Sequence, residues 1–218
     1  MEIKITRKRM KNIIIRVNEK GEVLVSAPLR VPKYYIENLI KEKEEWIRKK
    51  IALVKSRKEK VKTNTFDEGE KFVYLGKEYL IEIKKSEEEY CKLENDRFII
   101  YLQKNSQEKR KALISRWVYE NFNSYMLKRT LEIGKKIGYK PNAIKFREMK
   151  TRWGSCNSLT KSITYNYRLY DKPIEVVDYV ILHELSHIPY PHHQKSFWDF
   201  VERYMPDWKK RRELLKGV

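Results

Sequence analysis

Cysteine is scarce in this sequence: Cys91 and Cys156 are the only two among 218 residues. Neither belongs to a CxxC pair, so the chain has no thiolate zinc motif and no set of cysteines that would suggest a disulfide framework. Any metal site would therefore need ligands other than sulfur.

Long apolar runs are also missing. No stretch approaches the ~20 apolar residues that a membrane-spanning helix needs. Residues 1–17 mix charges with apolar residues, unlike the continuous apolar segment of a signal peptide. These absences predict a cytoplasmic protein with no membrane partner.

Acidic residues are outnumbered by basic ones. The chain has 30 Asp and Glu against 49 Lys and Arg, a formal net charge of +19. Such an excess attracts nucleic acid and other polyanions. The basic residues run along the whole chain without a block, which a generally solubilising surface explains equally well. Nonspecific nucleic-acid contact through this basic surface is therefore a hypothesis, and no recognised DNA-reading motif accompanies it.

The apolar and aromatic content is sufficient for a folded core, with 15 Tyr, 7 Phe and 5 Trp. Alternation and turn residues predict strands around 13–15 and 23–25, and a 3.6-residue period predicts a helix over 33–58. The polar residues 59–67 are typical of a linker. The later pattern predicts strands at 72–74, 79–81, 98–101, 144–149 and 162–169, and helices at 107–137, after Pro173, at 195–204 and at 207–216.

These elements predict an α+β protein. We expect a strand-rich N-terminal region over 1–105 and a mostly helical catalytic region over 106–218. The strands at 144–149 and 162–169 are expected to form a short β-hairpin within the second region.

The segment His183-Glu184-Leu185-Ser186-His187 is an HExxH motif. Residues four apart on a helix face the same side, so the two imidazoles can provide two corners of a tetrahedral zinc site. Glu184 can then act as general base towards a water molecule without binding the metal itself. The pattern predicts a metal-dependent hydrolase.

A catalytic zinc site needs a third protein ligand and an open position. Pro189 and Pro191 stop the helix soon after His187, and a short reversal can bring His193 back to the metal. His192 and Glu202 are the competing candidates for this third ligand. All four histidines of the chain lie between positions 183 and 193, which favours a metal site over scattered surface histidines.

Further segments flank this motif, and together with it they resemble the YgjP-like metallopeptidase domain family. The matching pieces are Arg152–Cys156, Asn166–Leu169, Asp178–His187, and His193 with Phe197-Trp198. The resemblance extends over nearly the whole chain. The segment between His187 and His193 is richer in proline than the family pattern, which is a mild departure from it.

The resemblance implies a zincin-like catalytic half related to SprT-like proteins, with zinc bound by His183, His187 and His193. Zincins bind an extended peptide beside a strand of the cleft, and we expect the strand 162–169 to take that role here. Asn166 and Arg168 are then candidates for substrate contact, or else both brace the turn at Gly154.

The predicted function is a zinc-dependent metallopeptidase that acts on a peptide or protein. One alternative is a metal-dependent nucleoside triphosphate pyrophosphohydrolase acting on a nucleotide, which suits the positive charge but lacks a phosphate-binding Gly-rich loop. Another is a protease associated with nucleic acid, as SprT-like relatives suggest. A nucleophilic role for Cys156 is the weakest alternative, because the histidines already have metal-ligand spacing.

Overall fold

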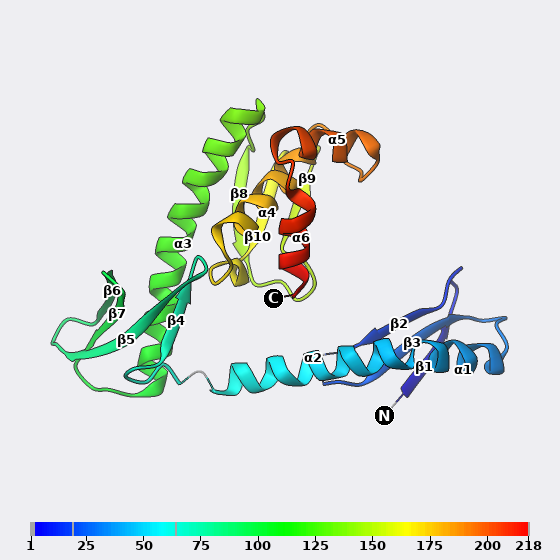
Figure 1. Cartoon of the computed structure of the whole chain (residues 1–218), viewed down its shortest axis with the longest axis horizontal. Coiled ribbons are helices and arrows are strands. Elements are labelled where there is room, and N and C mark those ends of the chain that lie inside the picture. The colour runs from blue at the N-terminus through cyan, green and yellow to red at the C-terminus, as the bar shows by residue number, and fades with distance from the viewer. Residues whose placement is uncertain (1–2, 19, 64, 218) are drawn as a thin grey trace. The chain divides into compact units, whose positions relative to one another are not determined.

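The computed structural model describes residues 3–18, 20–63 and 65–217. It divides into two compact units, Met1–Thr65 and Phe66–Val218 (Figure 1). This division comes 40 residues before the boundary expected at 105/106. The physical reason is that the strands between 71 and 102 share one hydrophobic core with the helices that follow them.

The first unit is a three-stranded sheet with two helices. Its strands are β1 (Ile3–Lys8), β2 (Ile14–Val17) and β3 (Val23–Pro28). The sheet order is β1-β3-β2, with β3 parallel to β1 and antiparallel to β2. Alternate residues of β3 point into the core, which explains its strict in–out pattern. The buried residues of this small core are Val23, Val25, Ala27, Ile36, Ile40 and Ile47.

The expected helix over 33–58 is present as two helices, α1 (Lys33–Glu42) and α2 (Glu44–Thr63), separated at Lys43. The amide of Lys43 still donates to the carbonyl of Leu39, so the break is a local change of direction. Since α2 continues to Thr63, most of the predicted linker over 59–67 is helical. Residue 64 of that segment lies outside the described residues.

The second unit begins with a four-stranded sheet of order β4-β5-β7-β6. Its strands are β4 (Lys71–Tyr74), β5 (Lys77–Lys85), β6 (Tyr90–Glu94) and β7 (Arg97–Leu102). The central strand β7 is buried at nearly every position, which fits its run of Phe, Ile and Leu. Trp117 of the next helix makes edge contacts with the rings of Phe72, Tyr74 and Phe98.

The long helix α3 (Gln107–Ile137) matches the predicted bounds. The Ser106 hydroxyl accepts the amide of Lys109 at the start, and Gly138 ends the helix with φ of 81°. Its N-terminal part packs on β6 and β7. Further along, Thr130 donates to the Tyr165 hydroxyl of the second sheet, so α3 joins both sheets of this unit (Figure 1).

The second sheet corrects the expected hairpin. Its strands are β8 (Ala143–Arg147), β9 (Gly154–Asn157) and β10 (Ser162–Asn166), in the order β8-β10-β9. The two predicted strands, β8 and β10, are parallel neighbours. The hairpin is instead formed by β9 and β10, which are antiparallel. The predicted strand to 169 ends at Asn166, after which residues Tyr167–Leu169 form a 3-10 turn.

Three helices complete the unit: α4 (Ile174–Ser186), α5 (Lys195–Tyr204) and α6 (Trp208–Gly217). Nearly every residue of α4 is buried, so it is the central helix of the core. Arg129 of α3 binds Asp178 of α4 through two nitrogens, each 2.7 Å from a carboxylate oxygen. Gly76, in the turn after β4, leaves no room for a side chain against the backbone of Pro173, the cap of α4.

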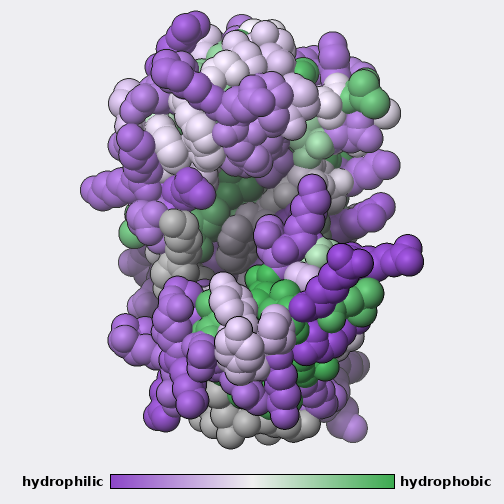
Figure 2. Space-filling model, turned by 90° about the vertical axis from the view of Figure 1, so that its right-hand side faces the viewer, coloured by the Kyte–Doolittle hydropathy of each residue, from purple (hydrophilic) through white to green (hydrophobic). Residues whose placement is uncertain are grey.

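The α+β class is confirmed, but helices occur in both halves of the chain. No helix within residues 3–18, 20–63 and 65–217 is long and apolar enough to span a membrane. Hydrophilic residues predominate on the face seen in Figure 2, as the net charge of +19 suggests.

Candidate metal centre

Helix α4 carries the HExxH motif in its last turn. The spacing of four residues places the rings of His183 and His187 against each other, with centroids 4.9 Å apart. The helix ends at Ser186, and the amide of Tyr190 donates to the Ser186 carbonyl in the turn that follows. This turn reverses the chain after Pro189, as the sequence predicted.

The reversal brings His193 to the other two imidazoles. The Nε2 atoms of His193 and His183 are 3.1 Å apart. One ligand atom from each of the three histidines lies within 4.8 Å of the others. The ring of Phe197, on α5, contacts all three imidazoles at centroid distances of 4.7–5.0 Å and forms an apolar support for them.

One nitrogen–nitrogen distance in the cluster is close to that of a tetrahedral metal site. Zinc–nitrogen bonds of about 2.05 Å put neighbouring ligand nitrogens about 3.3 Å apart, close to the His183–His193 separation. The Nδ1 atom of His187 lies 3.1 Å from the Tyr190 carbonyl oxygen. A carbonyl only accepts, so Nδ1 carries the proton and Nε2 keeps its lone pair for a metal.

The electrostatic surroundings favour neutral imidazoles, which are the form that binds metal. Burial, together with electrostatic interactions with His187, His193 and Arg212, lowers the pKa of His183 to about 3. Burial also lowers the pKa values of His187 and His193. The three rings are therefore available as ligands at neutral pH.

Glu184 follows the ligand candidate His183 directly in the chain and is only 6% exposed. Burial raises the pKa of its carboxyl group to about 8, an effect that Arg152 partly offsets. Its side chain lies against Gly154 at the start of β9. A Cβ at position 154 would lie 2.6 Å from both Cγ and Oε1 of Glu184. The strand can approach the carboxylate this closely because residue 154 has no side chain.

The family model of the YgjP-like metallopeptidase domain matches residues 11–217. The chain belongs to this family. Its membership makes it a metallopeptidase in general terms and implies a divalent metal, with which the three histidines are compatible. The predicted resemblance is confirmed over essentially the whole chain.

The YgjP-like chain is also similar to one solved metallopeptidase. The crystal structure of the metallopeptidase zymogen of Pyrococcus abyssi abylysin is 22% identical in sequence, with a TM-score of 0.37. The match covers 41% of this chain and 87% of that one. No curated protein matches the chain. The family assignment therefore rests on the sequence match.

The other candidates for a third ligand lie apart from the cluster. The group of potential ligands within the described part of this YgjP-like chain consists of His183, His187 and His193. Neither His192 nor Glu202 belongs to this group. Both side chains are exposed. The arrangement favours His193.

The two proposed substrate contacts differ in their surroundings. Asn166 is 2% exposed, and its amide nitrogen donates to the carbonyls of Met149 and Arg152. Its amide oxygen accepts the backbone N–H groups of Met149 and Arg168. These bonds favour the bracing role, since they hold the loop that leads to Gly154. Arg168 is exposed, and its role as a substrate contact stays a prediction.

Two further residues take structural positions in this YgjP-like chain. Asp178, the first residue of the matching segment Asp178–His187, is bound to Arg129 through both carboxylate oxygens. Burial, with the charge of Glu184, raises the pKa of the Cys156 thiol to about 11, which opposes a nucleophilic thiolate.

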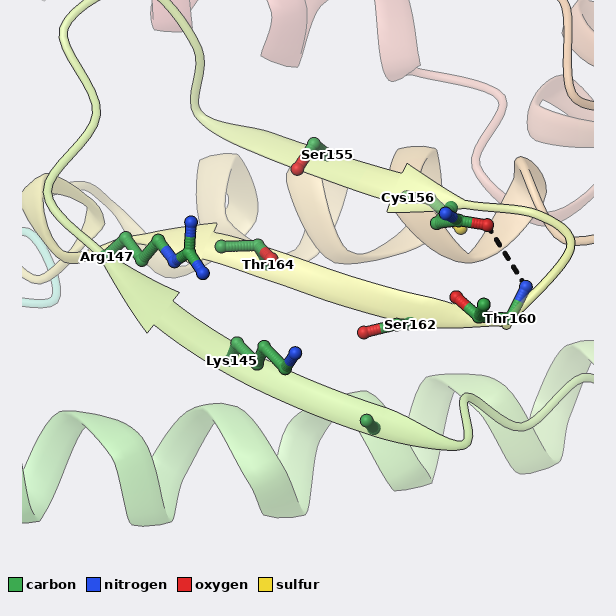
Figure 3. Close-up of a pocket in the computed structure, with 9 residues that line it drawn as sticks. Lys145, Arg147, Ser155, Cys156, Thr160, Ser162 and Thr164 are labelled. Atoms are coloured by element: carbon green, nitrogen blue, oxygen red, sulfur yellow. Dashed lines mark hydrogen bonds between the residues drawn. The ribbon is translucent and has the colours of Figure 1, made fainter.

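The outer face of the β8-β10-β9 sheet forms an open, polar groove of about 500 Å³ (Figure 3). Lys145 on β8, Thr164 on β10 and Ser155 on β9 are neighbours in register and form one row across its floor. Cys156 is paired in register with the buried Ile163. Because neighbouring residues of a strand point to opposite faces, the Cys156 side chain points away from the row of Lys145, Thr164 and Ser155 and towards Glu184. The groove and the histidine cluster therefore lie on opposite faces of β9.

Sequence reasoning missed two features near the cluster. The contact between Gly154 and Glu184 joins residues distant in the chain, and only the RWGSC segment of the family pattern pointed to it. Trp198 was part of the family match, and its indole N–H donates to the His193 carbonyl, 3.2 Å away. The guanidinium of Arg212, on α6, packs on the Trp198 ring, with its carbon 5.3 Å from the ring centroid.

Proposed function

We propose that the chain is a zinc-dependent peptidase in which His183, His187 and His193 bind the metal and Glu184 is the general base. The observation that carries this proposal is a group of three imidazoles whose ligand atoms lie within 4.8 Å of one another, with the buried Glu184 next to His183 in the chain. Three protein ligands leave the fourth tetrahedral position open, as catalytic zinc sites require.

A zinc ion held by His183, His187 and His193 would supply a Lewis acid that could activate water and polarise the carbonyl of the scissile peptide bond. The contribution of Glu184 is to accept a proton and to return it to the leaving amine. Burial raises the pKa of this carboxyl group. The contact with Gly154 keeps its carboxylate in one position.

The substrate strand proposed here is β9 rather than β10. The expected strand, β10, is central in its sheet and is paired on both sides, with β8 and with β9. It therefore has no free edge for a peptide. Strand β9 is an edge strand of this sheet, and its first residue contacts Glu184. A peptide that adds to β9 passes the carboxylate, and its side chains alternate between the metal side and the polar groove.

The proposal is tested with the zinc-loaded protein and Glu184→Gln, which keeps the shape of the side chain but cannot accept a proton. We expect cleavage of an unfolded protein such as reduced casein by the wild type, loss of cleavage with a chelator, and at least 100-fold slower cleavage by the variant with its zinc retained. Wild-type cleavage rates in Glu184→Gln would refute the general-base role.

A parallel assay separates the nucleotide alternative. The same protein is incubated with nucleoside triphosphates, and release of phosphate or pyrophosphate is measured beside His183→Ala. Hydrolysis of nucleotides that depends on His183, without cleavage of protein, would replace the peptidase proposal.

A further inference from the structure

Arg212 is held beside the metal centre by aromatic rings. Its guanidinium carbon is 5.3 Å from the ring centroid of Trp198 and 6.0 Å from that of Trp208. These two indoles are stacked, with centroids 4.3 Å apart and planes 17° apart. Guanidinium groups pack well on aromatic rings, so the exposed side chain has a defined position.

The same pair of indoles is tied to the histidine cluster. The Trp198 ring is stacked on His193 with centroids 5.7 Å apart, and its centroid is 6.0 Å from that of His183. Its N–H bond to the His193 carbonyl fixes it to the same loop.

The guanidinium of Arg212 has no ion pair or hydrogen bond with any residue in the described part of the chain. Its neighbour Arg211 differs, since it binds the Asp207 carboxylate at 2.8 Å and the Glu175 carbonyl at 3.2 Å. A bare cation beside a site for a divalent cation is electrostatically unfavourable. The negative charge of a bound ligand would remove this repulsion.

We propose that Arg212 is a substrate-recognition residue that binds a carboxylate of the peptide, from an acidic side chain or the C-terminus, next to the metal centre. This inference rests on the proposed peptidase function and adds its substrate class: peptides with a negative charge close to the scissile bond. The planar guanidinium of Arg212 carries pairs of N–H donors that match the two oxygens of a carboxylate.

The test measures binding instead of turnover. The probes are the monohydroxamates of succinic, glutaric and adipic acid, which can chelate zinc and carry a free carboxylate at three different reaches. Each is compared with the alkyl hydroxamate of equal length. Dissociation constants are measured by calorimetry on the zinc-loaded wild type, Arg212→Gln, Arg212→Lys and Lys209→Gln.

Lys209→Gln is the matched control. Lys209 is on the same helix, and its ammonium is 5.6 Å from the centroid of Trp208, so the variant removes the same charge from the same surface. A urea unfolding curve for each variant confirms that it is folded before binding is measured.

We expect at least one carboxylate probe to bind the wild type about tenfold more tightly than its alkyl analogue. Arg212→Gln should lose that preference, Arg212→Lys should keep part of it, and Lys209→Gln should keep it in full. Equal affinity of acids and alkyl analogues for the wild type, or equal losses in Arg212→Gln and Lys209→Gln, would overturn the proposal. If no hydroxamate of either kind binds the zinc-loaded protein, the proposed metal function has failed, and the role of Arg212 fails with it.

Discussion

Gly154→Ala adds one methyl group at the point where β9 meets Glu184. The new Cβ would lie 2.6 Å from Cγ and Oε1 of Glu184 and 2.7 Å from Cδ. Nonbonded carbon atoms prefer separations of about 3.5–4.0 Å. The Glu184 side chain or β9 must therefore move by about 1 Å. The φ angle of Gly154 is outside the left-handed region, so alanine causes no backbone strain and the effect reports the contact alone.

A displacement of this size is expected to lower kcat/KM by about 100-fold, while overpacking lowers the free energy of unfolding by about 1–3 kcal/mol. Peptidase assays, zinc analysis and urea unfolding measure the three quantities separately. Zinc content should stay at the wild-type level, because the three atoms nearest to the added Cβ all belong to Glu184, which is not a proposed ligand. The control is Ser155→Ala in the same strand, whose side chain lines the outer groove and does not add to the Glu184 contact, so it should lower kcat/KM far less than Gly154→Ala. Wild-type kcat/KM in Gly154→Ala would refute the role assigned to this contact.

Two further predictions concern stability. Burial raises the folded-state pKa of Glu184 from 4.5 to about 8. In chelator-treated protein, the contribution of this group to the free energy of unfolding is therefore fully present below pH 4.5 and is lost as the pH rises towards 8. Glu184→Gln should therefore be about 2–4 kcal/mol more stable than wild type at pH 8 and equally stable at pH 4, in urea titrations; equal stability at both pH values would contradict the burial of a carboxylate there. Asn166→Ala removes hydrogen bonds to Met149 and Arg152 and should lower the free energy of unfolding by about 2–3 kcal/mol. An unchanged unfolding midpoint would show that Asn166 does not brace this loop.

Local sequence patterns predicted much of the fold, because the relevant interactions are close in sequence. The Ser106 cap and Gly138 define both ends of α3, and the turn after His187 follows from Pro189 and Pro191. The HExxH spacing likewise predicted the ring contact between His183 and His187, since a helix alone sets it.

The errors concern pairings between distant segments. The strand pattern of residues 144–149 and 162–169 says nothing about a third strand between them, so β8 and β10 were expected to form a hairpin. The structure divides into units at 65/66, before the expected boundary at 105/106, and no local signal shows that Phe98 packs on Trp117. The neighbours of Arg212 are hidden for the same reason: α5 and α6 must both be in place before the indoles stack.

The central claim is that three imidazoles of this chain bind one zinc ion, and zinc analysis tests it most directly. Protein is stripped with a chelator, loaded with zinc, dialysed and analysed by mass spectrometry of the metal, for wild type, His183→Ala, His187→Ala, His193→Ala and His192→Ala. We expect about one zinc per wild-type chain, the same for His192→Ala, and strongly reduced zinc in the other three variants. A wild-type protein without zinc, or a His193→Ala variant that keeps a full equivalent, would contradict the account.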